Sequence, residues 1–476
     1  MDPVSPTRTR RVIAAAVTAC VILGAALRFL YCLTEFWLDE IWSVLLLKTG
    51  KINGWWDIVV NLRHDNNHIA NTLFIYLVGD TQNWGIYRLP ALFAGVATVV
   101  LMWWIARRRS PAEGLFAAAL TAFSFPLILY SSEARGYGPA IFFSLLAFHA
   151  LSRHLESPSL KQLLTFHAAS ALAAFSHLSF VHVYLSLIAW SLVRVARRPD
   201  APKAKIRALA AIHLPPLAVL GFLYAAYVHG LKIGGGPHYT VFHVTREAAA
   251  LAVGAPETGI PAYLGLAAAV LIAALGIMRL ARQKDDIWIF HLCVLLLAPA
   301  LVLLVEKPEV LYFRYFIVCF PFFYLLAARL LAEAWAKPPG ARAVAAVLLS
   351  LFLVGQAAYS VRFHRYGRGG YFKALKFVAA NTRGPAIVVG SSDDYVNCKV
   401  LTYYSQFLPK DRGLYYVDRE NLPRDPPEWF FVDVHEPGAK PEKALRIPLG
   451  HDYRFVAAFR YSGFSGFDWF VYHRET

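Results

Sequence analysis

Apolar stretches separated by short polar segments recur from residue 12 to residue 360. Many are about 18–22 residues long, which is the length an α-helix needs to cross the hydrocarbon core of a bilayer. A shorter apolar run at 69–80 is expected to be re-entrant or interfacial. The pattern predicts a polytopic α-helical membrane protein with about 11–13 spans. The full spans are expected at residues 12–31, 87–106, 112–130, 138–153, 165–179, 180–195, 207–227, 260–280, 287–305, 315–334 and 341–360.

The pattern changes after residue 361, where charged residues become more frequent and the apolar runs shorten. Helices and short strands are expected to alternate here, which predicts a small extramembrane α/β domain. We therefore divide the chain into a multi-span catalytic domain, residues 1–361, and a C-terminal domain, residues 362–476. The expected elements are helices at 372–381 and 398–407, strands at 386–389, 414–417 and 429–432, and a closing hairpin formed by 455–459 and 469–472.

Composition agrees with a membrane protein, because 57% of the 476 residues are apolar and only 16% are charged. The net charge of +16 comes largely from basic clusters at the ends of apolar runs, such as Arg107–Arg109. Such clusters stay on the cytoplasmic side, and their natural partners are anionic membrane lipids rather than nucleic acid. We expect an integral protein of a bacterial inner (plasma) membrane. Its loops 32–67, 228–258 and 306–315 and its C-terminal domain are then extracytoplasmic.

A pair of adjacent acids follows the first expected span. Asp39 and Glu40 lie between Trp37 and Trp42, and indole rings favour the membrane–water interface. An unpaired carboxylate near a bilayer is costly to keep ionised. The pair therefore indicates acid–base chemistry or a metal site. The alternative is structural, since carboxylates can satisfy the free amides at the start of a helix.

Other polar residues fall on the same expected face of the membrane. They offer bases, cations and hydroxyl groups around one possible cavity at the outer surface. They are Arg63, Asp65, His68, Glu133, Arg135, Tyr137, His177, Arg314 and Tyr315.

Several of these residues also have a simple structural interpretation. Asp65 can cap the helix that follows it. His177, inside an apolar run, can be a packed and hydrogen-bonded histidine. Glu133 and Arg135 can pair with each other, and Arg314 can anchor a helix among the lipid head groups.

Three motifs together resemble the GT-C superfamily of membrane glycosyltransferases, and its protein O-mannosyltransferase and lipid A aminoarabinose transferase branch in particular. The first motif is Leu38-Asp39-Glu40 with Trp42-Ser43, the second is His64–His68 before a helix, and the third is Ser132–Tyr137 before a span. Arg314-Tyr315 with Pro321 is similar to a late motif of that family. The resemblance covers residues 10–335 by layout, although Ile69-Ala70-Asn71 stand where the family usually has prolines.

The resemblance implies a GT-C fold and an inverting transferase. Such an enzyme moves a sugar from a polyprenyl-phosphate-linked donor to a glycan, lipid or protein acceptor on the outer face. An acceptor hydroxyl needs a carboxylate base as it attacks the anomeric carbon, and Asp39 is the counterpart of that base. Glu40 is the second catalytic acid.

The remaining roles follow from the charge of the departing lipid phosphate. Arginine suits phosphate because its planar fork donates two parallel hydrogen bonds. The resemblance implies Arg63, Arg135 and Arg314 as cations, with Tyr137 and Tyr315 as hydroxyl donors. Metal or substrate positioning is assigned to Asp65, His68, Glu133 and His177. A divalent metal cation is a possible cofactor, and no nucleotide cofactor is expected.

Two other classes of protein remain open. A transporter or lipid flippase also has many spans and buried charges, although the polar residues here are expected at one membrane face rather than at mid-depth. A lipid head-group phosphotransferase would use the same cations with a different nucleophile. A non-catalytic scaffold leaves the acid pair without a purpose.

Overall fold

The structure is a computed structural model that describes residues 6–48, 50, 52–231, 235–236, 238–422, 424–436, 438–447 and 451–475. The chain forms two compact units. The helical unit consists of Met1–Cys32, Gly50–Val78 and Tyr87–Ala358. The C-terminal unit consists of Leu33–Thr49, Gly79–Ile86 and Tyr359–Thr476, so it also includes the segment that carries the acid pair.

Seven helical segments of the described chain are long and apolar enough to cross a membrane. Three shorter apolar helices accompany them, Ile69–Val78, Pro111–Phe123 and Phe180–Ala196. The predicted fold class, a polytopic helical membrane protein with a small C-terminal α/β domain, is confirmed. The number of crossings stays a prediction. The seven segments are Arg10–Cys32, Trp84–Ala106, Pro202–Val228, Gly259–Arg282, Ile287–Glu306, Phe313–Trp335 and Pro339–Asn381.

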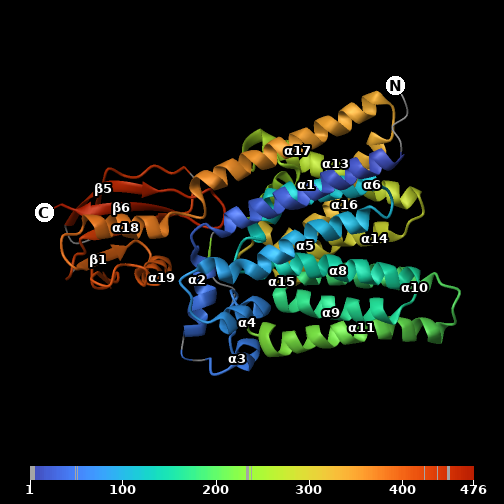
Figure 1. The fold of residues 1–476 in the computed structure, drawn as a ribbon. Helices are drawn as coiled ribbons and strands as arrows, with labels where there is room; N and C mark the ends of the chain where they lie inside the picture. The colour runs from blue at the N-terminus through green and yellow to red at the C-terminus, as the bar shows by residue number, and fades with distance from the viewer. Residues whose placement is uncertain are drawn as a thin grey trace. The chain divides into compact units, whose positions relative to one another are not determined.

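The centre of the helical unit is a set of closely packed helices. Helix α5 (Leu89–Ala106) packs against α1 (Pro6–Cys32), α6 (Pro111–Phe123) and α8 (Tyr137–Glu156). Helix α9 (Leu160–Ser176) lies between α8 and α11 (Pro202–Leu223), and Figure 1 shows these three running side by side. The other helices here are α3 (Trp55–Val60), α4 (Ile69–Val78), α7 (Phe125–Tyr130), α10 (Phe180–Ala196), α12 (Val241–Val253), α13 (Gly259–Arg282), α14 (Ile287–Leu292), α15 (Ala298–Glu306), α16 (Phe320–Trp335) and α17 (Pro339–Tyr366), which continues into the C-terminal unit.

The expected span at 112–130 is broken into α6 and α7. Pro126, in the first turn of α7, cannot donate a backbone hydrogen bond to α6. Backbone groups at such a break need other partners inside a membrane. Buried Arg28 donates to two carbonyl oxygens at the end of α6, at 3.1 Å each. The Phe125 N–H donates to Gln356 Oε1 at 2.7 Å. The break is therefore a satisfied structural feature that leads into residues 131–136.

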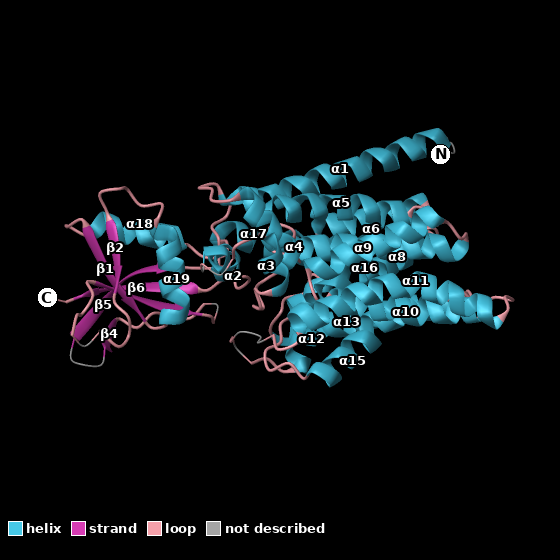
Figure 2. Ribbon diagram, turned by 90° about the horizontal axis from the view of Figure 1, so that it is seen from below, coloured by secondary structure: helices cyan, strands magenta, loops and turns pink. Residues whose placement is uncertain are grey.

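The C-terminal unit contains a six-stranded sheet in the order β2-β1-β3-β6-β5-β4. Strand β1 pairs in parallel with β2 and β3, and the other pairs are antiparallel. Helix α18 (Tyr371–Asn381) contacts β5 and β6, and α19 (Asp394–Ser405) contacts β1 and β2 (Figure 2). The strands are β1 (Ala386–Ser391), β2 (Gly413–Tyr416), β3 (Trp429–Val434), β4 (Ala444–Ile447), β5 (His451–Phe459) and β6 (Asp468–Arg474).

Elements α3, α12 and β4 were not among those expected from the sequence pattern. Helix α12 lies in the segment that we assigned to an outer loop. Its end signals are nevertheless present in the sequence. The Thr240 hydroxyl accepts the His243 N–H at 3.1 Å, and Gly254 ends the helix with φ +80°. A polar N-cap and a left-handed glycine are common at helix ends.

Candidate functional site

His68 joins two of the sequence motifs in the helical unit. The Gly136 N–H donates to His68 Nδ1 at 2.7 Å, and Arg135 Nη2 lies 3.2 Å from His68 Nε2. Burial, together with the charge of Arg314, lowers the pKa of His68 to about 3. The imidazole is therefore neutral. Because Nδ1 accepts a hydrogen bond, the ring proton lies on Nε2.

Gly136 allows the third motif to approach its neighbours closely. A Cβ atom at this position would lie 1.8 Å from the Ser176 carbonyl oxygen and 3.1 Å from His68 Cβ. Asn71 Nδ2 donates to the Ala134 carbonyl oxygen at 2.7 Å. The close approach of Gly136 to Ser176 and the hydrogen bond from Asn71 together fix the backbone of residues 131–136 against α9 and α4. Neither residue was expected to have a role, although Gly136 belongs to the third motif and Asn71 closely follows the second.

Aromatic rings surround the same loop. The rings of Tyr137 and His177 lie 4.3 Å apart, those of His68 and His177 4.7 Å apart, and those of Tyr130 and Tyr137 5.0 Å apart, measured between centroids. The Ser179 N–H donates to His177 Nδ1 at 3.0 Å, so this ring is also oriented by a backbone amide. The packed-histidine interpretation of His177 and a role in the site are therefore compatible.

Two arginines belong to this cluster. The guanidinium carbon of Arg135 lies 5.2 Å from the ring centroid of Tyr137. That of Arg314 lies 4.3 Å from Tyr312 and 5.9 Å from Tyr315. Arg135 is 3% exposed and Glu133 is completely buried. The rings of Tyr130 and Phe313 lie 5.8 Å apart between centroids, and the charge of Arg314 acts on His68. The structure therefore brings the second and third motifs together with the late Arg-Tyr motif, which is far from them in sequence.

The Tyr137 hydroxyl is a polar group that the fold leaves available. Tyr137 is completely buried, and its hydroxyl has no hydrogen-bond partner among the residues that the structure describes. Burying a hydroxyl without a hydrogen bond is costly. A bound group that accepts a hydrogen bond would remove this cost.

A cavity of about 630 Å³ adjoins the cluster. Its walls are mostly apolar and come from α9, α10, α11, α15 and the segments beside them. Its polar lining residues include Asp65, His68, His177 and Tyr315. Arg63, Arg135, Tyr137 and Arg314 are not among the lining residues of the cavity. Arg63 is exposed, and its Nη1 lies 3.5 Å from the His229 carbonyl oxygen.

The His64–His68 loop is held from the cavity side. The Tyr227 hydroxyl, in the π-helical turn Tyr224–Val228 after α11, donates to the carbonyl oxygens of His64 (2.6 Å) and Asn67 (2.9 Å). Single π-turns of this kind are frequent at functional sites. Asp65 Oδ1 lies 2.9 Å from His64 Nδ1.

Asp39 and Glu40 belong to the C-terminal unit. They lie in the first turn of α2 (Leu38–Leu45), whose N-cap residue is Trp37, so neither acid occupies the capping position. Glu40 is completely buried, and its Oε2 lies 3.9 Å from Arg368 Nε. Asp39 is 9% exposed and is the more accessible acid of the pair.

The described residues contain no group of three or more His, Cys, Asp or Glu side chains that could hold a metal ion. His68 is a poor ligand because its Nδ1 accepts a backbone hydrogen bond and its Nε2 faces the guanidinium of Arg135. The residues described do not fit the divalent metal that the resemblance implied.

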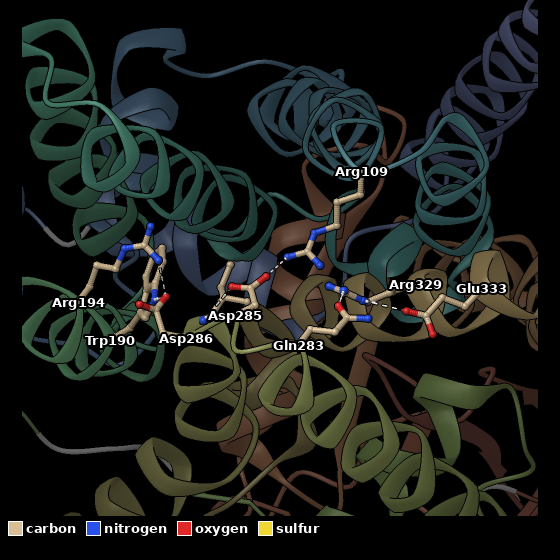
Figure 3. A network of polar contacts seen from close by, with 9 residues as sticks. Arg109, Trp190, Arg194, Gln283, Asp285, Asp286, Arg329 and Glu333 are labelled. Atoms are coloured by element: carbon tan, nitrogen blue, oxygen red, sulfur yellow. Dashed lines mark hydrogen bonds and ion pairs between the residues drawn. The ribbon is translucent and has the colours of Figure 1, made fainter. Parts of the chain in front are cut away.

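A second polar cluster of the helical unit joins the arginine-rich ends of several helices (Figure 3). Arg109 Nη2 lies 2.6 Å from Asp285 Oδ2, and Asp286 Oδ1 accepts from Arg194 (2.8 Å) and Trp190 (3.1 Å). The figure also shows Arg329 between Gln283 and Glu333. We expected these arginine-rich ends to contact lipid. Here arginines and acids pair and connect α10, α16 and the loops beside α5 and α14.

Comparisons with known proteins agree with the sequence motifs. Residues 69–221 match the family model of dolichyl-phosphate-mannose-protein mannosyltransferases. No curated protein sequence matches the chain. The apo crystal structure of ArnT from Cupriavidus metallidurans matches with a TM-score of 0.51 and 12% identity, over 88% of this chain and 93% of that chain. At this identity the match shows a shared fold.

Two further solved structures have lower scores. The apo Archaeoglobus fulgidus oligosaccharyltransferase has a TM-score of 0.48 and 12% identity, over 83% of this chain and 60% of that chain. ArnT bound to undecaprenyl phosphate has a TM-score of 0.35 and 13% identity, over 98% of both chains. The family match and the fold shared with apo ArnT confirm the resemblance to GT-C membrane glycosyltransferases.

Proposed function

We propose that this chain is an inverting glycosyltransferase that moves a sugar from a polyprenyl-phosphate-linked donor to an acceptor at the extracytoplasmic face of the membrane. The observation that carries the proposal is the apolar cavity of about 630 Å³ beside a buried cluster of arginine, tyrosine and histidine. Apolar walls suit an isoprenoid chain, and the cations and hydroxyl group suit its phosphate. ArnT, which shares the fold, has been crystallised with undecaprenyl phosphate.

The proposed reaction is a single displacement. Asp39 takes the proton of the acceptor hydroxyl, whose oxygen bonds to the anomeric carbon. The bond between that carbon and the phosphate oxygen breaks, and polyprenyl phosphate leaves with the electron pair. Attack on the face opposite the leaving group inverts the anomeric centre. The residues described hold no metal ligand set, so this mechanism assigns no step to a metal.

The developing negative charge on the phosphate requires donors placed in advance. We assign this role to Arg135 and Arg314, with the Tyr137 hydroxyl as a neutral donor. His68 acts indirectly: its Nδ1 holds the Gly136 amide and thereby the loop that carries Arg135. Tyr315, Asp65 and His177 line the cavity and are assigned to the sugar of the donor. Glu133 is assigned to orienting the loop, and the exposed Arg63 is assigned to first contact with the anionic donor.

The central test is Asp39→Asn in the purified full-length protein in nanodiscs. Turnover is measured as undecaprenyl phosphate released from undecaprenyl-phosphate-linked sugars in the presence of a cell-envelope extract as acceptor. Loss of a general base lowers turnover by about a hundred- to ten-thousandfold, while the affinity for undecaprenyl phosphate stays unchanged. Asp80→Asn is the matched control, since Asp80 lies in the same unit with a 79% exposed side chain. Parental turnover in Asp39→Asn would refute the assignment.

The lipid product separates the alternatives. A glycosyltransferase leaves the phosphate on the lipid, whereas a head-group phosphotransferase passes it to the acceptor and leaves a lipid alcohol. Mass spectrometry of the extracted lipid distinguishes the two products. A flippase would move the donor between leaflets and yield neither.

The phosphate site has its own test in Tyr137→Phe. The change removes a hydroxyl that has no partner among the described residues, so folding should be unaffected. The affinity for undecaprenyl phosphate should fall about three- to tenfold, the value of one hydrogen bond. Tyr76→Phe is the control, because Tyr76 is 38% exposed whereas Tyr137 is completely buried. Unchanged affinity in Tyr137→Phe would remove this residue from the phosphate site.

A further inference from the structure

The segment that carries Asp39 is built into the C-terminal unit. Helix α2 packs against α19, which lies more than 350 residues further along the chain. The Trp42 ring lies 5.6 Å from that of Tyr395, and Lys399 Nζ lies 4.6 Å from the Trp42 ring centroid. The indole that we expected at the lipid interface therefore packs against protein.

Residues just before α2 are held through their backbone and by one carboxylate. The Tyr404 hydroxyl, from α19, donates to the Phe36 carbonyl oxygen at 2.8 Å. The Phe372 N–H, at the start of α18, donates to Glu35 Oε2 at 2.8 Å. Trp84 Nε1 donates to the Thr34 carbonyl oxygen at 3.1 Å. These contacts come from three separate parts of the sequence and converge on three consecutive residues, 34–36.

Arg368 is the charged group at the centre of this arrangement. Its side chain and that of Glu40 are both completely buried, and Arg368 Nε lies 3.9 Å from Glu40 Oε2. The guanidinium also donates to Thr34 Oγ1. One side chain therefore contacts both the segment before α2 and the first turn of α2.

The backbone around Arg368 is tightly constrained. Gly367 and Gly369 have φ of +64° and +134°, values that favour glycine. The Arg368 carbonyl oxygen accepts the Tyr371 hydroxyl at 2.8 Å. A Cβ atom at Gly466 would lie 1.7 Å from that same oxygen. The turn after α17 and the loop between β5 and β6 thus fix the position from which the arginine reaches Glu40.

We propose that Arg368 is a positioning residue for catalysis, which orients the Asp39 carboxylate by holding Glu40, the next residue in the first turn of α2. The proposal rests on the proposed function, in which Asp39 is the base. The C-terminal unit is then a working part of the enzyme, because it supplies the framework of the catalytic helix. Glu40 serves as the buried anchor of that helix.

The test uses the full-length protein in nanodiscs and the turnover assay with undecaprenyl-phosphate-linked sugar. Arg368→Gln should lower kcat about 10- to 100-fold, the effect of misplacing a reacting group by about 1 Å. KM for the donor and affinity for undecaprenyl phosphate should change less than about twofold, because the proposed phosphate site lies in the helical unit. Arg368→Lys, which keeps the charge, should recover part of the loss.

Two further variants make the test specific. The double variant Glu40→Gln/Arg368→Gln should be no slower than the slower single variant, since both changes break one interaction. Arg412→Gln is the matched control: Arg412 is in the same unit but donates to the Thr382 and Gly384 carbonyl oxygens, so its kcat should equal the parental value.

Tyr404→Phe covers the case in which Arg368→Gln does not fold. It removes one hydrogen bond to the Phe36 carbonyl oxygen without leaving a buried charge, and it should lower kcat about three- to tenfold. Suppose that Asp39→Asn is inactive. Parental kcat in folded Arg368→Gln would then overturn the proposal. If only Tyr404→Phe folds, parental kcat in that variant would overturn it. Parental turnover in Asp39→Asn would instead overturn the proposed function.

Discussion

Gly136→Ala is a sharp perturbation of the cluster around His68. The added Cβ would lie 1.8 Å from the Ser176 carbonyl oxygen, and real Cβ atoms stay at least 3.0 Å from such atoms, so one of the two segments must move by about 1.2 Å (3.0 − 1.8). The Gly136 N–H that donates to His68 Nδ1 at 2.7 Å moves with it. Overpacking of this kind costs about 1–3 kcal/mol. The lost hydrogen bond adds about 0.5–1.5 kcal/mol.

The displacement also carries Arg135 and Tyr137, the neighbours of Gly136. A shift of about 1 Å in a substrate-positioning group costs about a hundredfold in rate. We therefore expect turnover to fall by about that factor and affinity for undecaprenyl phosphate to fall as well. Both are measured on the same purified protein, with its thermal unfolding midpoint.

The matched control is Gly221→Ala, in helix α11 of the same unit. Nothing lies within 4 Å of its added Cβ, and alanine is favoured over glycine inside a helix by about 1 kcal/mol. This variant should be as active as the parent and at least as stable. Parental turnover and donor affinity in Gly136→Ala would refute the packing argument, because they would mean that the loop tolerates the displacement.

Three other predictions concern pH, the ion-pair network and topology. Burial lowers the pKa of His68 to about 3 in the folded chain, against about 6.5 in the unfolded chain. Between these values the unfolded state binds more protons, so the free energy of unfolding falls as pH decreases below about 6.5. From pH 7 to pH 5 the thermal unfolding midpoint should therefore fall less in His68→Gln than in the parent, and an equal fall would contradict a neutral buried His68. Asp286→Asn removes the charged acceptor of Arg194 and Trp190. It should lower the free energy of unfolding by about 1.5–3 kcal/mol without changing the affinity for undecaprenyl phosphate. A change in that affinity with unchanged stability would show that the network belongs to the donor site. Protease added to intact spheroplasts should cleave residues 362–476, whereas cleavage only in inverted vesicles would place that domain in the cytoplasm.

The apolar pattern predicted most helices because a bilayer-length apolar run is a strong signal. The division of one expected span into α6 and α7 was missed, although Pro126 was visible in it. The pattern could not show which side chains form hydrogen bonds with the backbone groups at the break. Arg28 and Gln356 come from helices that are distant in sequence, and no local pattern marks a side chain as the partner of a remote backbone group.

For the candidate site, too, the sequence did not show which distant residues contact one another. Residue type and motif spacing indicated candidate residues for chemistry, because carboxylates, arginines and histidines are rare in apolar surroundings. It did not indicate which unit each motif belongs to. Asp39 and Glu40 closely follow α1 in sequence, yet both belong to the C-terminal unit, where α2 contacts α19 and Glu40 pairs with Arg368. Glu40 is completely buried, and Arg368, whose Nε lies 3.9 Å from Glu40 Oε2, is 328 residues away in sequence (368 − 40). The ion pair between Arg368 and α2 is thus a long-range contact that the fold alone reveals.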